Sequence, residues 1–495
     1  MDPRIFPAWL IGTHFLNILF LTLLARSGLQ ILGSFPRLYR NDGCEPGTEI
    51  LKFGQGEIPR DRLVTSLEQE VKMPAWLALP GGTQLGIGRH WHFASVILWI
   101  LTGLVYVILL LTTGDWRRLV PTSPGVFPQA LHDLVSYLHL SLPPPQPGMP
   151  YNALQQLTYF AVVFLLAPLQ IATGAAMSPA VIGRFPWYSR MFGGRQVARS
   201  LHFASLLAFG AFVVVHTLMV VVHGLGAELA KMALGSERAD HGLAILVSGV
   251  ALLLVLVINV LATRFGVSRP RATQRLLGLL VDPVQQLLNR ISVSHQAYRT
   301  SDISPYHWVN GRPPEQATYT EDAGRDFREW RLEIRGLVKT PARLSLASLR
   351  ELGQESHIVK HNCIQGWSGV AEWTGVPLSA LLDLVGPLPQ ARFLVVQGLD
   401  DKAQTDPEHG RGRYYEVIDL AVARGPQAQL AYEMNGQPLS VEHGAPLRLR
   451  LETQLGFKMV KWIESIELVS DYAQIGQGQG GWREDNQFYS RLAAI

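Results

Sequence analysis

Apolar residues form long runs in the first half of this chain and short alternating patterns in the second half. A helix needs about 20 mainly apolar residues to cross a hydrocarbon core of about 30 Å, and five runs approach or exceed that length. The first run contains Asn17, but it lacks the basic segment and the small-residue cleavage site of a signal peptide, so we expect it to stay in the membrane. The predicted membrane spans are Trp9–Ala25, Phe93–Thr112, Leu154–Gly174, Leu201–Val222 and Gly242–Ala262.

The second half has the short patterns of an α+β domain. Alternation of apolar and charged residues predicts half-buried strands, a short apolar run predicts a buried strand, and Asn435-Gly436 predicts a hairpin. The fold class is therefore multidomain, with an all-α transmembrane bundle of about five spans followed by one α+β domain. The predicted strands are Trp330–Gly336, Leu447–Glu452 and Phe393–Gln397, and the predicted helices are Pro377–Val385 and Glu416–Arg424.

A third pattern lies between the two halves. Apolar residues from Leu276 to Ile291 recur at helical spacing, with a break expected at Pro283. This pattern predicts an amphipathic helix, which lies either on the membrane surface or against the soluble domain. The predicted boundaries are residues 1–263 for the transmembrane domain, 264–303 for the interfacial linker and 304–495 for the soluble domain.

Histidines in the apolar runs are candidate metal ligands, because an ionisable side chain inside a membrane is costly and usually functional. His202 and His216 are 14 residues apart. On one helix they would lie about 21 Å apart on nearly the same side, which suits two haems at different depths. His92 and His202 share a local pattern, since each is followed by Phe-Ala-Ser and preceded three residues earlier by an arginine. His14 lies within the first span.

This arrangement resembles the di-haem cytochrome b subunits of respiratory hydrogenases and formate dehydrogenases. The resemblance covers about residues 8–225 and implies that His92 and His202 share one haem b, while His14 and His216 share the other. The alternative for each histidine is a polar group bonded to a neighbouring helix. His90 and His223 are the next candidates as ligands.

Cys363 is the strongest candidate for chemistry in the second half. It lies in a Gly- and Trp-rich segment that we expect to form a turn leading into an amphipathic helix. The only other cysteine is Cys44, so a cysteine-rich zinc or iron–sulfur site is excluded by counting. Cys363 is then either an inert buried thiol or a thiolate that holds a soft metal whose other ligands come from a cofactor.

The segment Val359–Gly375 resembles the molybdenum-ligand loop of the sulfite-oxidase family, and Leu430–Leu439, His443–Arg448 and Gly456–Ile463 match that family in order and spacing. The resemblance implies that Cys363 is catalytic and binds molybdenum beside the dithiolene of one molybdopterin. It also implies Arg448 in a catalytic anion pocket, Lys458 and Lys461 near the pterin phosphate, and His307, Trp308, Asn310, His361 and Asn362 as further cofactor contacts.

The formal net charge of +4 suits a membrane surface, and no aromatic-basic motif for nucleic acid is present. Most Lys and Arg residues of the first half lie in the loops that follow the first, third and fifth spans. Because such residues concentrate on the cytoplasmic side of an inner membrane, we expect the soluble domain in the cytoplasm, with the periplasm as the alternative.

Together these features predict a membrane-bound molybdenum oxidoreductase that couples oxygen-atom transfer to a quinone pool through two b-type haems. The substrate is expected to be a small oxyanion or an S- or N-oxide, and the direction of electron flow stays open. Membrane lipid and quinone or quinol are expected partners, and a second copy of the chain is a further candidate. The alternatives are a molybdenum enzyme with a haem-free membrane anchor and a soluble electron partner, or a metal-free sensing module.

Overall fold

The computed structural model describes residues 6–54, 58–59, 62 and 64–491, and the chain divides into two compact units. The helical unit consists of the chain up to Gly28, Trp91–Ala175 and Arg199–Ser268. The sheet unit consists of Leu29–His90, Ala176–Ala198 and Arg269 onwards. Two long loops between membrane helices therefore fold with the sheet unit, whereas the boundaries predicted at 263 and 303 assign them to the transmembrane domain.

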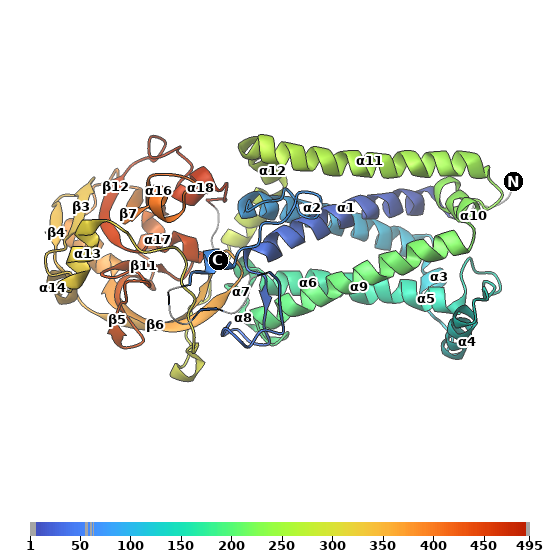
Figure 1. Ribbon diagram of the computed structural model, residues 1–495, viewed down its shortest axis with the longest axis horizontal. Helices are drawn as coiled ribbons and strands as arrows, with labels where there is room; N and C mark the ends of the chain where they lie inside the picture. Colours follow the sequence, from blue (N-terminus) through green and yellow to red (C-terminus); the bar gives the residue numbers. More distant parts are fainter. Residues whose placement is uncertain (1–5, 55–57, 60–61, 63, 492–495) are drawn as a thin grey trace. The chain divides into compact units, whose positions relative to one another are not determined.

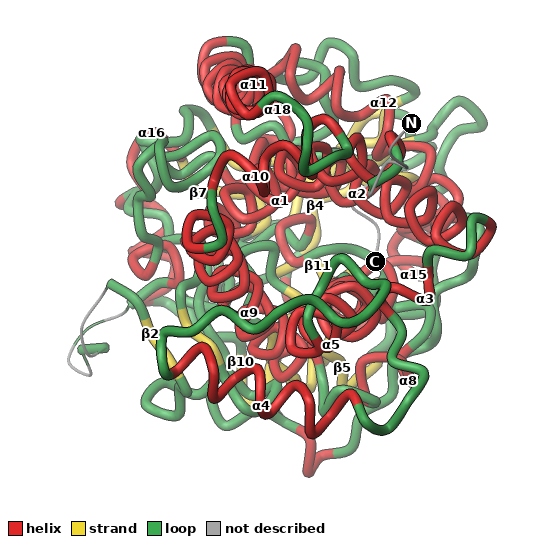
Figure 2. The backbone as a smooth tube through the Cα atoms, turned by 90° about the vertical axis from the view of Figure 1, so that its right-hand side faces the viewer, coloured by secondary structure: helices red, strands yellow, loops and turns green. Residues whose placement is uncertain are grey.

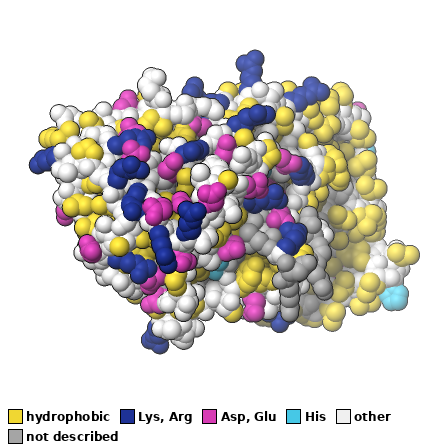
Figure 3. Space-filling model, turned by 60° about the vertical axis from the view of Figure 1, so that its left-hand side comes forward, with side chains coloured by type: hydrophobic (Ala, Val, Ile, Leu, Met, Phe, Trp, Pro, Cys, Tyr) yellow, Lys and Arg dark blue, Asp and Glu magenta, His cyan; other side chains and the backbone are white. Residues whose placement is uncertain are grey.

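Five helices in the described part of the chain are long and apolar enough to cross a membrane, which confirms the predicted number. Each is longer than its predicted apolar run, because the helix continues into flanking residues that satisfy their own backbone hydrogen bonds. Large apolar side chains such as Leu104, Ile108 and Leu253 are exposed on these helices, as a lipid-facing surface requires. Figure 3 shows hydrophobic side chains (yellow) gathered over one part of the molecular surface. The spans are α1 (Ala8–Ser34), α2 (Leu85–Thr112), α5–η2–α6 (Ala153–Met177), α9 (Arg195–Val222) and α11 (His241–Ser268) (Figure 1).

Polar contacts join the fifth span to the first. Arg26 on α1 donates hydrogen bonds to Asn259 Oδ1 at 3.0 Å and to Thr263 Oγ1 at 2.6 Å on α11. Asn259 Nδ2 in turn donates to Thr22 Oγ1 at 3.0 Å. Since polar side chains in apolar surroundings need partners, these bonds hold α11 against α1.

The described strands all belong to the sheet unit (Figure 2, yellow). One five-stranded sheet has the order β10-β9-β6-β5, with β11 also paired to β9, and the other has the order β4-β3-β12-β7-β8. Only β12 and β3 pair in parallel in the second sheet. The strands of the first sheet are β5 (Glu355–Asn362), β6 (Ser368–Pro377), β9 (Ala428–Met434), β10 (Gln437–Pro438) and β11 (Arg448–Leu451); those of the second are β3 (Leu332–Gly336), β4 (Ala342–Leu344), β7 (Phe393–Asp401), β8 (Arg413–Asp419) and β12 (Ile463–Val469).

Several predicted elements are confirmed. The apolar run at Phe393 forms β7, and the helix predicted at Pro377–Val385 is α15 (Leu378–Val385). The hairpin predicted at Asn435-Gly436 joins β9 to β10, with Gln437 opposite Met434. The amphipathic segment forms α12 (Pro270–Asn289), which runs through Pro283 without ending there. Pro283 removes one backbone donor from the interior of this helix, and the flanking turns continue on both sides of it.

Three local predictions are wrong. The helix predicted at Glu416–Arg424 begins only at Leu420 as the short α17 (Leu420–Ala423), because the residues before it pair with β7 as strand β8. The segment after Cys363 is strand β6 rather than an amphipathic helix, since it pairs with both β5 and β9. Strand β11 is buried on both faces instead of half-buried, so its two arginines lie inside the domain.

Packing between β6 and β9 gives the first prediction. A Cβ on Gly375 would lie 2.1 Å from the carbonyl oxygen of Leu430 and 2.6 Å from Ala431 Cα, both of which are backbone atoms. Gly375→Ala is therefore expected to destabilise the sheet unit by about 1–3 kcal/mol, because the strands must separate. Thermal unfolding of the detergent-solubilised protein measures this effect. Gly324→Ala is the matched control, since its added Cβ meets nothing within 4 Å, and an equal loss in both variants would contradict the packing argument.

Candidate functional site

Cys363 lies at the tip of the β5–β6 hairpin, in a tight turn. Its backbone N–H donates to the carbonyl of Trp367 at 3.0 Å, and Gly366 takes the positive φ of 123° that this turn requires. The side chain is 2% exposed, and Asn310 Nδ2 donates to its Sγ at 3.4 Å. Burial raises the pKa of the Cys363 thiol, while hydrogen bonds from Gln365 and Asn310 act in the opposite direction. The turn thus presents one sulfur atom to a pocket.

Three histidines surround the pocket that Cys363 lines. The ring centre of His307 lies 5.5 Å from that of His361 and 5.6 Å from that of His443. Burial, followed by nearby positive charge, lowers the pKa of His307 and of His361 well below the ordinary value, and the pKa of His443 to about 4. The three rings are therefore neutral at physiological pH and leave the positive charge of the pocket to other residues.

Arg448 and Lys461 supply that charge. Among the described residues, no carboxylate lies within ion-pair distance of either side chain. Arg448 donates to the carbonyl of His443 at 2.9 Å and lies over the ring of Trp373, and Lys461 donates to the carbonyl of Glu442 at 2.9 Å. Burial, and then the neighbouring cations, lower the pKa of both groups. A buried cation without a carboxylate favours a bound anion, because the anion offsets the cost of removing the charge from water.

Unsatisfied polar atoms mark the same pocket. His307 Nε2, Trp367 Nε1 and Arg448 Nε are buried and make no hydrogen bond to the rest of the described chain. Buried polar groups in native proteins nearly always have partners, so these atoms indicate a polar ligand. A pterin with a terminal phosphate fits this donor set, since its ring system offers acceptors and its phosphate matches the buried cations.

The structure brings most of the predicted pocket residues together. His307, Trp308, Asn310, His361, Cys363, Arg448 and Lys461 all line the pocket. Asn362 is buried beside Cys363 without lining it, and Lys458 points away to bind Glu416 and Glu484. The structure therefore does not support a phosphate contact for Lys458, because its charge is already matched by two carboxylates.

Other lining residues were not predicted individually, although Trp367, His443, Phe457 and Trp462 lie in segments that match the sulfite-oxidase family. Lys402 pairs with Asp400 at 2.7 Å. Asp400 lies at the end of β7, and Lys402 begins the short helix α16 (Lys402–Thr405). Charged residues near strand ends carry no local signal that distinguishes them from surface residues, so only the fold could reveal them. The additional lining residues include Trp367, Asp400, Lys402, Tyr414, Glu442, His443, Phe457, Trp462 and Arg483.

In the helical unit, the four predicted histidines form two facing pairs. The ring centres of His14 on α1 and His216 on α9 are 6.3 Å apart, and those of His92 on α2 and His202 on α9 are 6.4 Å apart. Two imidazole nitrogens that bind one metal at about 2 Å each, with each nitrogen about 1 Å from its ring centre, put the ring centres about 6 Å apart. Both pairs therefore have the spacing that a shared haem iron requires.

Neighbouring groups orient the rings of the second pair. Ser27 Oγ lies 3.1 Å from His92 Nδ1, and Thr173 Oγ1 lies 3.1 Å from His202 Nδ1. Fixing Nδ1 in this way directs Nε2 towards a metal. Gln170 Nε2 lies 3.0 Å from His202 Nε2, so this amide would have to move when the nitrogen binds iron.

Glycine allows a close approach to the ring of His202, whereas the space beside His92 would admit a Cβ. A Cβ on Gly28 would lie 3.6 Å from His92 Cε1, and one on Gly174 would lie 3.3 Å from His202 Cε1.

The two alternative ligands, His90 and His223, form hydrogen bonds to other groups. His90 bonds the carbonyl of Gly86 at 2.8 Å, and His223 bonds the carbonyl of Met219 at 2.9 Å and the hydroxyl of Tyr137 at 3.2 Å.

Family comparisons agree with both sites. Residues 319–475 match the oxidoreductase molybdopterin-binding domain, and residues 5–235 match the prokaryotic cytochrome b561 family. The protein is thus a multi-pass membrane protein in which a cytochrome b561 domain, a haem b protein, is fused with a molybdopterin-binding oxidoreductase domain. The fold class predicted from the sequence is confirmed, whereas the narrower hydrogenase and formate-dehydrogenase type stays a prediction.

Individual relatives match shorter stretches. YedZ1 of Azospira oryzae, described provisionally as a protein-methionine-sulfoxide reductase subunit, is 34% identical over 188 residues, or 38% of this chain and 65% of the relative. The protein-methionine-sulfoxide reductase catalytic subunit MsrP of Gluconobacter oxydans is 36% identical over 146 residues, or 28% of this chain and 47% of the relative. The chain thus spans less than two thirds of the length of each of these relatives.

MsrP of Campylobacter jejuni is 25% identical over 188 residues, or 37% of this chain and 62% of the relative. Among solved structures, the sulfane dehydrogenase SoxCD from Paracoccus pantotrophus matches 32% of this chain and 40% of its own, at 24% identity and a TM-score of 0.26. That score is too low to support an argument about this chain.

The facing pairs give the second prediction. His92→Ala and His202→Ala should each remove the same haem, and His14→Ala and His216→Ala the other, because bis-histidine ligation needs both partners. Haem per chain, measured from the pyridine haemochrome spectrum, is expected to fall by half in each variant. His90→Ala and His223→Ala are controls that should keep the full haem content. Loss of one and the same haem in all four variants would show a single-haem protein.

Proposed function

We propose that this protein is a membrane-bound molybdenum oxidoreductase that removes the oxygen atom from an S-oxide, with electrons supplied by quinol through two haems b. The observation that carries the proposal is the presence, in one chain, of a thiol-lined pocket with buried cations and two histidine pairs at iron-binding distance. Buried cations and intramembrane histidines are costly to remove from water, and a bound cofactor in each place would offset that cost.

In the sheet unit, Cys363 is the ligand of the metal, and Arg448 and Lys461 hold the anionic end of the cofactor. When bound, molybdopterin supplies the molybdenum that exchanges an oxygen atom and two electrons with the substrate. The neutral rings of His307 and His361 can accept or donate hydrogen bonds to the pterin without adding charge. Burial of the pocket keeps water from competing with these contacts.

In the helical unit, each histidine pair holds one haem between two helices. Because His202 and His216 lie 14 residues apart on α9, the pairs sit about 21 Å apart along that helix, at two depths in the membrane. Haem carries single electrons, so two haems can divide the two electrons that each oxygen-atom transfer consumes. A quinol in the membrane is the electron donor that this location favours.

Reduction is favoured over oxidation by two relatives named as catalytic subunits of protein-methionine-sulfoxide reductases. The pocket also suits a sulfoxide, because Phe457, Met459 and Trp462 offer apolar contacts to the groups on its sulfur. The histidine pairs weigh against a haem-free anchor. The pocket around Cys363 weighs against a metal-free sensing module.

For the topology, we propose an inner-membrane location with the sheet unit in the cytoplasm. Basic residues in the loops that follow the first, third and fifth spans support this orientation. A reporter fused to the carboxy-terminal end, read together with protease protection in intact cells, tests it. Exposure of the sheet unit on the periplasmic side would replace the proposed orientation by its alternative.

The third prediction tests the metal ligand. Cys363→Ser should lose turnover and retain less molybdenum, because a hydroxyl replaces the soft sulfur donor, while haem absorbance stays unchanged. Metal analysis and quinol-dependent reduction of methionine sulfoxide measure the two effects. Cys44→Ser, at the other buried cysteine, is the matched control that should keep both. Full molybdenum and full activity in Cys363→Ser would show that the sulfur is not the ligand.

A substrate panel tests the proposed reaction. Methionine sulfoxide, dimethyl sulfoxide, an N-oxide, chlorate and sulfite are offered while haem oxidation is followed in the protein reduced with a quinol analogue. Oxidation of the haems by sulfoxides supports the proposal. Haem reduction by sulfite, with no response to sulfoxides, would show an oxidase that works in the opposite direction.

A further inference from the structure

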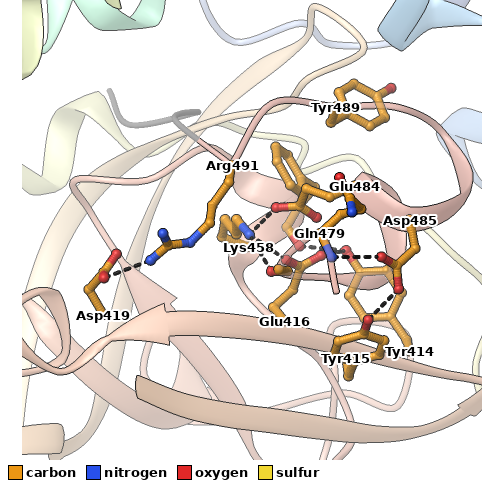
Figure 4. A network of polar contacts seen from close by, with 12 residues as sticks. Tyr414, Tyr415, Glu416, Asp419, Lys458, Gln479, Glu484, Asp485, Tyr489 and Arg491 are labelled. Carbon is orange, nitrogen blue, oxygen red and sulfur yellow. Dashed lines mark hydrogen bonds and ion pairs between the residues drawn. The ribbon is translucent and has the colours of Figure 1, made fainter. Parts of the chain in front are cut away.

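A buried charged cluster lies beside the pocket, and the proposed pocket chemistry leaves it without a role. Lys458 in the short helix η5 (Gly456–Lys458) binds Glu416 on β8 at 2.7 Å and also Glu484 on α18 (Trp482–Asn486) (Figure 4). The two carboxylates are fully buried, and the lysine is 2% exposed. We call these three residues the Lys458 cluster.

The Lys458 cluster has one more carboxylate than it has cations. Within the described part of the chain, Lys458 is the one cation within ion-pair distance of Glu416 or Glu484. A Cβ on Gly481 would lie 2.2 Å from Glu416 Oε2 and 2.4 Å from Glu484 Oε2, so these two oxygens are less than about 5 Å apart. Two buried carboxylates this close do not both ionise beside a single ammonium group, and one proton is therefore shared between them.

The hydrogen bonds of Tyr414 support a proton on Glu416. The Tyr414 hydroxyl oxygen lies 2.6 Å from the carbonyl oxygen of Phe457 and 2.9 Å from Glu416 Oε1. The hydroxyl has one hydrogen, and the carbonyl can only accept it. When that hydrogen points to Phe457, the contact with Glu416 is satisfied only if the carboxyl group carries the second hydrogen.

Tyr414 connects the cluster with the pocket. Its side chain lines the pocket together with Phe457 and Arg483, whereas Glu416 and Glu484 lie behind it. Strand geometry turns the next residue, Tyr415, to the opposite side, where its hydroxyl bonds Asp485 (Figure 4). Tyr414 therefore joins the pocket that it lines to Glu416, which it contacts through its hydroxyl.

We propose that Glu416 and Glu484 store one proton and deliver it through the Tyr414 hydroxyl to the pocket during oxygen-atom removal. This inference rests on the proposed function, in which a sulfoxide, two electrons from quinol and two protons give a sulfide and water. The S–O bond breaks, the sulfur is reduced, and the oxygen leaves as water with both protons, which the pair delivers one after the other and regains from solvent in between. Tyr414 gives up its hydroxyl proton and regains one from Glu416, so the tyrosine ends each cycle unchanged.

The surrounding charges favour this proton store. Burial, and then the charge of Glu484, raise the pKa of Glu416 well above its ordinary value, and burial raises the pKa of Glu484. Burial, and then the charge of Glu416, raise the pKa of Tyr414, so the tyrosine relays a proton without ionising. The other charged or titratable groups near these residues are Arg483, Asp485, Tyr415 and Lys402, whose Nζ lies 4.9 Å from the Tyr414 ring centre.

The segment Gly476–Gly481 covers the cluster. The carbonyl of Gly480 accepts a hydrogen bond from Lys458 Nζ at 3.1 Å, and the backbone N–H groups of Gln477 and Gln479 donate to Asp485. Gly481 is the residue of this segment that approaches the two carboxylates, because a Cβ there would meet an oxygen of each. Gly476 and Gln477 are exposed, whereas Gly480 and Gly481 beside the cluster are buried, so solvent protons that refill the pair would enter at the start of this segment.

The pH profile of the holoenzyme tests the relay. Since the pKa values of the pair are raised, the store is full at low pH and empties as pH rises through them, so kcat for sulfoxide reduction should fall on the alkaline side. Glu416→Gln and Tyr414→Phe should lower kcat about 10- to 100-fold with little change in KM, and should remove that pH dependence. A wild-type kcat and pH profile in Glu416→Gln would overturn the relay.

Matched controls separate proton transfer from packing. Tyr415→Phe removes a hydroxyl from the adjacent residue. Asp419→Asn removes an exposed carboxylate from the same strand, where it pairs with Arg491 at 2.7 Å. Both should keep the wild-type pH profile. Molybdenum and haem content, measured in every variant, shows that each one folds.

Infrared spectroscopy tests the stored proton without any assay of activity. The resting protein should show the C=O stretch of a protonated buried carboxylic acid, shifted in D₂O and lost in Glu416→Gln or Glu484→Gln. Absence of such a band would overturn the inference, whatever the reaction is. If the band is present and no oxide is reduced, the proposed function fails while the shared proton stands.

Discussion

The buried positive charge of Arg448 and Lys461 is the constraint on which the pocket of the sheet unit depends. A cation removed from water without a carboxylate partner is stable only if an anion or a dense set of dipoles replaces the lost hydration. Carbonyls of His443 and Glu442 and the rings of Trp373 and Trp462 supply part of this replacement. The proposed anionic cofactor would supply the rest, and pocket and ligand would then stabilise each other.

The same constraint explains why the surrounding histidines are neutral. Near Arg448 and Arg450, a protonated imidazole would add charge to a site that already has too much. The charge of Arg450 is matched by an ion pair with Glu452 at 2.7 Å, and the charge of Lys458 by ion pairs with two glutamates. The domain thus separates its buried cations into those matched by carboxylates and those left for a ligand. Lys458, which looks in the sequence like Lys461, belongs to the first group for this reason.

In the helical unit the corresponding constraint is the cost of a polar side chain among lipids. Arg26 meets it by bonding Asn259 and Thr263 on another span. The four histidines meet it in pairs, each pair joining α9 to a different helix. A metal shared within each pair would satisfy both rings at once, which is why their depth along the helices is matched.

The sequence by itself determined the features that depend on local patterns. Long apolar runs need helices in a membrane, and the spacing of His202 and His216 follows from helix geometry, so the spans and the pairing of histidine depths were predictable. The hairpin at Asn435-Gly436 and helix α15 were also predicted from short-range sequence patterns.

Tertiary structure alone decided what depends on pairing between distant strands. Tyr414 to Asp419 is a strand because β7 lies beside it, and the arginines of β11 are buried because β9 and the loop before β12 enclose them. Whether a charged residue faces solvent, a ligand or a carboxylate is set by neighbours far away in the chain. The sequence could therefore place Lys458 and Lys461 near one another, but only the fold could give one a pair of glutamates and the other an open pocket.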